Sequence, residues 1–283
     1  MRRSRTFSST AFRVAAIGMF ALGTALLGTT GGCALARKTA RRVPSLENMA
    51  HVPAGEFTMG SDGEGAADDE RPVRTVWLEE FYIDRTEATN AEFMAFADST
   101  RRLYPNNPMW DQNYFLGSPN HPAINVTYEQ AVAYCQWKNK RLPTEAEWEK
   151  AARGTDARVY PWGYEWDETR ANLWGDSFGT DVFYNTAPVG SFPDGASPYG
   201  ALDMIGNVWE WCEDWFDAEY YSRGENRNPH GPKEPTPWRV VRGGSFSSPR
   251  TPTGDATIAN RSKNHASLPI HHIGCRCAWS PKD

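Results

Sequence analysis

The segment Lys140-Arg-Leu-Pro-Thr-Glu-Ala-Glu-Trp148 carries the clearest local structural signal in this chain. Thr144 and Glu147 form a capping box, in which the hydroxyl and the carboxylate each bind one of the unpaired amides that begin a helix. Trp148 and Ala152 follow at the spacing of one helical face. The segment therefore predicts a short helix whose tryptophan packs into a core.

The same signals occur elsewhere in the chain. Thr89-x-x-Glu92 and Thr127-x-x-Gln130 are capping boxes ahead of apolar stripes, and they predict two more short helices. Three segments favour strands: 75–83, 238–242 and 273–278. The stretches between them are dense in Gly, Pro, Asn and Asp, and no linker-like break follows His51. This pattern predicts one α+β domain over residues 49–283, with few regular elements and much irregular loop.

Further sequence blocks carry a family resemblance. They are Val52-Pro-Ala-Gly-Glu-Phe-Thr-Met-Gly60, Pro161-Trp-Gly163, Thr186-Ala-Pro-Val189, Gly206-Asn-Val-Trp-Glu-Trp211, Val241-Arg-Gly-Gly-Ser-Phe246 and Gly274-Cys-Arg-Cys277. With the 140–148 segment, and in this order, they resemble the formylglycine-generating, sulfatase-modifying-factor family over nearly the whole domain. The resemblance implies a variant of the C-type-lectin-like fold, with short helices and a small twisted antiparallel sheet.

Most residues of these blocks are expected to be scaffold. Trp148, Trp209 and Trp211 are large apolar side chains with one donor each, and burial with a hydrogen bond suits them. Gly206 and the Gly243-Gly244 pair are expected where the backbone takes a conformation closed to other residues.

The resemblance also implies two calcium sites, with ligands carried over position by position. The first would use the side chains of Asn172 and Asp181 and the carbonyls of Leu173 and Phe183. The second would use the side chains of Asp203 and Glu210 and the carbonyls of Gly206 and Val208. Ligand sets made only of oxygen suit calcium rather than zinc or copper. The alternative is that these acids are solvated, or that Glu210 is buried against an arginine.

The catalytic cysteines of the family are missing. In enzymes that make formylglycine, the resemblance implies a copper(I) ion held by two thiolates five positions apart. When Gly244 to Cys277 is laid on that pattern without a gap, the two positions fall on Thr253 and Ile258. Neither side chain can replace a thiolate, and residues 247–264 contain no cysteine at all. Copper is therefore not expected as a cofactor, and Thr253 and Ile258 are degenerate catalytic positions.

The remaining cysteines suggest disulfides. The resemblance implies a bond between Cys135, on the predicted 127 helix, and Cys277. Cys275 is then either the partner of Cys212 or a free buried thiol, because spacing does not determine connectivity. His265, His271 and His272 are the only other candidate metal cluster, but no acid lies nearby at ligand spacing, so a surface position is the expectation.

The first 33 residues have the pattern of an export signal. Arg2, Arg3 and Arg5 precede an apolar run from 14 to 27, which is too short to span a membrane. Small residues then lead directly into Cys33, as in a lipobox whose cysteine is acylated, although ordinary cleavage nearby is the alternative. Residues 34–48 are basic and polar and would form a tether. The chain is thus expected to be periplasmic or on the cell surface, anchored by lipid to a bacterial membrane.

Charge limits the possible partners. Removal of residues 1–33 takes away four arginines and no acid, which changes the net charge from −5 to −9. Nucleic acid is therefore not expected as a partner. The missing thiolates favour a non-catalytic, calcium-stabilised binding or assembly module for a protein or glycan ligand. The alternative is an enzyme, either formylglycine-generating or another oxidoreductase in protein or siderophore maturation, that uses a divergent site.

Overall fold

The computed structural model describes residues 43–174 and 183–282, which belong to one compact unit, Arg42–Asp283. Its longer helices are α1 (Asn90–Thr100), α3 (Tyr128–Trp137) and α4 (Glu145–Arg153), and both hydrogen bonds of the capping box are present in each. The three predicted helices are therefore confirmed. The shorter helical elements are α2 (Tyr114–Gly117), α5 (Tyr220–Arg223), η1 (Asp68–Glu70), η2 (Glu168–Arg170), η3 (Pro193–Gly195) and η4 (Gly254–Ala256).

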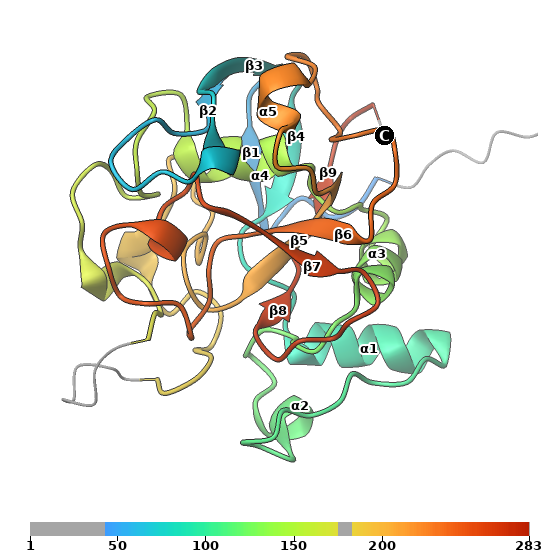
Figure 1. Cartoon of the computed structure of the whole chain (residues 1–283). Coiled ribbons are helices and arrows are strands. Elements are labelled where there is room, and N and C mark those ends of the chain that lie inside the picture. The colour runs from blue at the N-terminus through green and yellow to red at the C-terminus, as the bar shows by residue number, and fades with distance from the viewer. Residues whose placement is uncertain (1–42, 175–182, 283) are drawn as a thin grey trace, which may run out of the picture. The chain divides into compact units, whose positions relative to one another are not determined.

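The strands form small sheets, which Figure 1 shows with the largest crossing the middle of the domain. That sheet has the order β7 (Arg261–His265), β6 (Trp238–Arg242), β5 (Trp209–Trp215), β8 (Ile273–Gly274), and only its β5–β8 pair is parallel. A second, antiparallel sheet has the order β1 (Met49–Val52), β4 (Phe81–Asp84), β9 (Ala278–Trp279). The third is the hairpin of β2 (Gly55–Met59) and β3 (Arg74–Leu78).

Two of the predicted strands divide between sheets. The segment 75–83 contributes to β3, which pairs with β2, and to β4, which pairs with β1. The segment 273–278 similarly passes from β8, beside β5, to β9, beside β4. Each prediction of one continuous strand was wrong because the chain leaves one sheet and joins another within a few residues. The predicted strand 238–242 is confirmed as β6.

A hydrophobic core covers each face of the four-stranded sheet. Trp211 and Val241 pack with residues of α1 and α3, whereas Cys212 and Val240 pack with α4 and with strands β1 to β4. Successive residues of a strand point to opposite faces, so β5 and β6 contribute to both cores. The indole nitrogens of Trp148 and Trp211 donate to Glu210 Oε2 and to the Val126 carbonyl, each at 2.8 Å, which confirms burial with a hydrogen bond for these two.

The predicted special glycines are also confirmed. Gly206, Gly243 and Gly244 have φ values of +80°, +98° and +73°. A Cβ on Gly206 would lie 2.4 Å from the Asn172 carbonyl oxygen, so the two runs assigned to calcium touch here through their backbones. None of the helices in the described ranges has the length and apolar character needed to cross a bilayer.

Candidate functional site

The loop between β6 and β7 contains Thr253 and Ile258, the two positions that the resemblance assigns to the copper ligands. Thr253 is exposed, whereas Ile258 is fully buried in the core that contains Trp148. Outside the loop, burial raises the pKa of the free thiols Cys212 and Cys275 far above its ordinary value. The other two described cysteines are joined in a disulfide. Residues 43–174 and 183–282 therefore present no accessible thiolate.

A buried charge network fixes the end of this loop. Arg242, at the end of β6, binds Glu145 Oε1 and Glu149 Oε2 of α4, both at 2.9 Å. Its remaining donors reach the carbonyls of Ile258 at 2.6 Å and Asn260 at 2.9 Å. The two acids of α4 thereby hold the returning limb of the loop through one guanidinium.

The start of the loop is closed by short polar contacts. Ser248 Oγ donates to Asp255 Oδ2 at 2.7 Å and accepts from the Ser245 amide at 3.0 Å. A Cβ on Gly244 would lie 2.6 Å from the Asp255 carbonyl oxygen, so glycine is required where the two limbs meet. Hydrogen bonds and backbone contacts thus hold the loop in a defined conformation, although it contains no cysteine.

A cavity of about 530 Å³ opens beside the loop. Its lining includes residues 252–254, Thr257 and Ala259 of the loop, together with the glycine-rich turn 60–66. A Cβ on Gly65 would lie 3.3 Å from Thr253 Cγ2, so the turn packs directly on Thr253.

The first set of calcium ligands is only partly described. Asp181 lies outside the described residues, and Phe183 packs its ring against Phe192 with centroids 6.4 Å apart. The amide nitrogen of Asn172 donates to the Asn185 carbonyl at 2.8 Å, and the Leu173 carbonyl accepts from Arg250 at 3.1 Å.

The second set lies in a buried cluster of acids. Glu210 accepts from Arg276 at 2.6 and 2.7 Å and from the Trp148 indole, as the alternative of a buried ion pair expected. Asp203 Oδ2 accepts from the Gly190 amide at 2.6 Å. The cluster also contains Glu87, whose Oε1 accepts from Asn207 at 2.9 Å. Its buried Oε2 faces no N–H or hydroxyl donor in the described part of the chain, and its carboxyl group shares a hydrogen bond with Asp203.

The charges of this cluster do not balance. Burial, and then the negative charge of Asp203, raise the pKa of Glu87 well above its ordinary range. If Glu87, Asp203 and Glu210 are all ionised, Arg276 compensates only one of them. Either a proton held between Glu87 and Asp203, whose pKa values are both raised, or a divalent cation held by oxygen ligands would remove this excess charge.

Glu87 is the residue that sequence reasoning missed. Its amide partner, Asn207, is 120 positions away, and no local motif marks the carboxylate. Over the two described ranges, no group of three or more His, Cys, Asp or Glu side chains is arranged to hold a metal ion. Any ion in this cluster would therefore depend on backbone carbonyls as well, as the carried-over set of Gly206 and Val208 requires.

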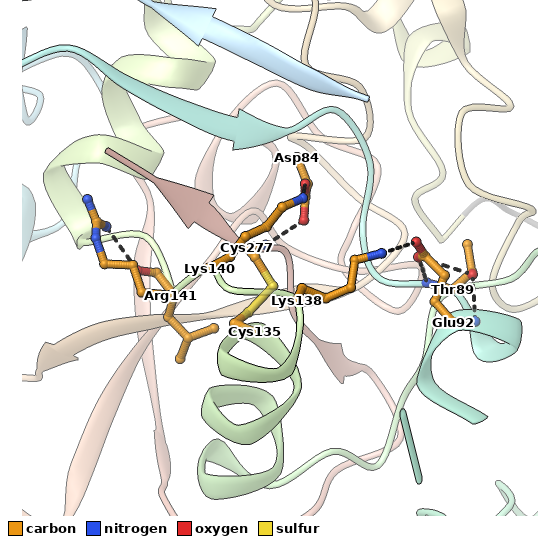
Figure 2. Close-up of a disulfide and its surroundings, with 9 residues drawn as sticks. Asp84, Thr89, Glu92, Cys135, Lys138, Lys140, Arg141 and Cys277 are labelled. Carbon is orange, nitrogen blue, oxygen red and sulfur yellow. Dashed lines mark hydrogen bonds and ion pairs between the residues drawn. A yellow bond between two sulfur atoms is a disulfide. The ribbon is translucent and has the colours of Figure 1, made fainter. Parts of the chain in front are cut away.

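The described cysteines form one disulfide, and the other two are free thiols. Cys135 and Cys277 are joined with an S–S distance of 2.02 Å, as the resemblance implied. Figure 2 shows this disulfide beside the ion pair of Lys140 with Asp84, at 2.5 Å. Of the two alternatives for Cys275, the structure shows the free buried thiol rather than a bond to Cys212, which is also free and buried. They belong to the two different cores: Cys212 is a residue of β5 and packs in the core with α4, whereas Cys275 packs in the core with α1 and α3.

The histidine segment lies against aromatic side chains. The ring of His271 is 5.2 Å from Trp110 and 5.0 Å from His272, measured between centroids. Burial, and then His271, lower the pKa of His272 to about 4. At neutral pH His272 therefore adds no positive charge to the loop surface.

Comparisons with known proteins agree with this geometry. Residues 35–281 match the family model of the sulfatase-modifying factor enzyme 1-like domain. A formylglycine-generating enzyme of Streptomyces coelicolor is 37% identical, over 84% of this chain and 91% of that protein. The chain therefore belongs to the sulfatase-modifying-factor family, with its mixed α+β fold.

Two further matches show the range of the family. An inactive C-alpha-formylglycine-generating enzyme 2 of Bos taurus is 30% identical, over 82% of this chain and 87% of that protein. The solved structure of PvdO from Pseudomonas aeruginosa superposes with a TM-score of 0.71 and is 28% identical, over 81% of this chain and 93% of that one.

Proposed function

We propose that this chain is a non-catalytic, calcium-stabilised binding or assembly module, exported and anchored to a bacterial membrane by a lipid on Cys33. The observation that carries the proposal is the absence of cysteine from residues 247–264. Oxygen activation by copper(I) needs soft thiolate ligands, and the hydroxyl of Thr253 and the alkyl group of Ile258 cannot supply them.

The burial of the remaining thiols supports the proposal. A thiolate is the form that binds metal, and the raised pKa values of Cys212 and Cys275 keep both protonated at neutral pH. The bovine relative described as inactive indicates that the fold can be retained without the activity. The loops between Ser247 and His272 would then form the surface that recognises a protein or glycan ligand.

Calcium would be held by the two oxygen sets and would act on stability. Asn172, Leu173, Asp181 and Phe183 would form one site, and the cluster around Asp203 the other. These residues lie where long loops meet, so an ion there would fasten chain segments that regular structure does not hold.

The test is an assay for aldehyde formation. The purified chain, supplied with copper and oxygen, is expected not to convert the cysteine of a sulfatase-type peptide to formylglycine, measured by mass spectrometry. The double variant Thr253→Cys, Ile258→Cys serves as the internal control and should gain affinity for copper(I). Turnover by the natural chain above a copper-only blank would overturn the proposal.

The second candidate is an oxidoreductase with a divergent site. The 37% identity with the Streptomyces enzyme favours it, because most of the scaffold of that enzyme is retained. The same assay tests the formylglycine-generating form of this candidate, since only that form predicts turnover of the sulfatase-type peptide by the natural sequence.

A further inference from the structure

The cavity beside Thr253 has walls of two kinds. Val73, Val159 and the ring of Tyr160 give it apolar surface. The hydroxyls of Tyr160 and Tyr164 are bound to the Pro252 and Asp156 carbonyls, so both rings offer their apolar bodies to the cavity. A ligand with an aliphatic part would bury that part here.

The polar lining of the cavity is acidic. Glu70 lines it although only 3% of the residue is exposed. Burial raises the pKa of its carboxyl group, while the charge of Arg242 and the Ala67 amide act in the opposite direction. Asp62 and Glu64 add two exposed carboxylates on the glycine-rich turn. The one cation in the lining, Arg153, is 3.1 Å from Glu149 and donates to the Arg158 carbonyl, so its charge is already compensated.

The spacing of the acids argues against a metal ion. In neither described range do three or more acid, histidine or cysteine side chains converge as metal ligands. A cation that carries its own apolar body satisfies both kinds of wall, because its charge can reach the carboxylates while its chain contacts Val73, Val159 and Tyr160.

We propose that this cavity binds an alkylammonium group: a primary amine on an aliphatic chain, such as a lysine side chain in a partner protein or a free polyamine. The proposal deepens the binding function proposed above, since residues 252–254 of the recognition loop form one wall. It does not depend on the copper assay, so the two can fail separately.

The experiment compares a charged ligand with its neutral counterpart, and adds a polyamine to identify the source of the amine. Nα-acetyl-lysine methylamide, its neutral counterpart Nα-acetyl-norleucine methylamide, and spermidine are titrated into the full chain by calorimetry, with calcium saturating throughout. The lysine amide is expected to bind saturably and at least about tenfold more tightly than the norleucine amide, a difference typical of a charge-assisted contact. Tighter binding of spermidine would identify a polyamine source, and tighter binding of a lysine-containing tripeptide a protein source.

Variants locate the binding. Glu70→Gln and the double change Asp62→Asn, Glu64→Gln should each weaken the lysine amide several-fold. The double change Glu165→Gln, Glu168→Gln removes two exposed acids that do not line the cavity, and it should leave the affinity unchanged. The rim pair is exposed, so it remains informative if Glu70→Gln does not fold. Equal affinity for the lysine and norleucine amides, or equal losses in the cavity and control variants, would overturn the proposal.

Discussion

Arg242 shows how a single buried residue supports the loop. Its side chain is fully buried and compensates Glu145 and Glu149 while it binds two loop carbonyls. Methionine at this position would remove a buried charge from both acids. Among the described ion-pair partners, Glu145 would keep only Arg261, and Glu149 only Arg153. We expect Arg242→Met to lower the free energy of unfolding by about 3–5 kcal/mol, measured by urea denaturation.

Arg223→Met is the matched control. Arg223 pairs with Asp217, but its side chain is 59% exposed, and exposed ion pairs contribute less than about 1 kcal/mol. If the two variants lost similar stability, the network would not be holding the fold together in the way the geometry suggests.

Asp214 should make stability depend on pH. Burial, and then the charge of Glu145, raise its pKa from 3.8 to about 8. Between these values the folded state keeps a proton that the unfolded state releases, so this residue's contribution to stability falls as pH rises and levels off above about 8. Asp214→Asn cannot lose that proton, and its Tm relative to the natural chain should increase steadily from pH 5 to pH 8.

Asp167→Asn provides the comparison for this pH series. Hydrogen bonds from Thr169 and Arg170 lower the pKa of Asp167 to about 2, so it stays ionised over the same range. Its Tm difference from the natural chain should therefore be flat. A flat difference for Asp214→Asn as well would contradict the raised pKa.

At the scale of elements, the disulfide joins α3 to the segment that leads into β9. It closes a loop with a sequence separation of 142 residues, which on the chain-entropy model stabilises the fold by roughly 4–5 kcal/mol. Cys135→Ala with Cys277→Ala should lose much of this free energy of unfolding. Cys212→Ala removes a buried thiol that closes no loop and should cost less.

Peptide mapping under non-reducing conditions tests the bond directly. A linked peptide containing Cys135 and Cys277 is expected. Recovery of both as alkylated free thiols would reject the connection, and with it the placement of Cys277 beside α3.

The elements that could be predicted from sequence are those whose signals are local. A capping box lies within four residues, so α1, α3 and α4 were identified correctly. Strand β5 was not predicted, because a sheet covered on both faces shows no polar alternation. It also carries two buried acids, whose partners are distant in sequence. Glu210 accepts from Arg276, and Asp214 accepts from the Glu145 amide.

The same distinction applies to the candidate site. The absence of cysteine from residues 247–264 can be read without coordinates, because it is a property of the sequence itself. The cavity beside Thr253 and the role of Glu87 could not be predicted, because each arises where segments far apart in the chain meet. Gly65 and Thr253 are one example, and Glu87 and Asn207 are another.

At the scale of the whole molecule, a few buried interactions between distant segments hold the long irregular connections in place. The sheets are small. The buried cluster of acids around Asp203 joins three segments: Glu87 lies before α1, Glu210 lies in β5, and Arg276 lies before β9. If calcium completes this cluster, its effect should appear in global stability rather than in one loop.

Removal of calcium is therefore expected to lower the Tm of the full chain by several degrees. An ion that binds only the native state adds about 2.7 kcal/mol at a hundredfold excess over its Kd. Asp203→Asn should reduce the calcium-dependent part of Tm, whereas Asp194→Asn, an exposed acid outside both ligand sets, should leave it unchanged. The measurement is calorimetric melting with excess calcium and after exhaustive treatment with EGTA. An identical Tm in the two conditions would rule out both calcium sites. Glu87 would then have to be protonated beside Asp203, because Arg276 is the cation that offsets the charge of both acids in the described part of the chain.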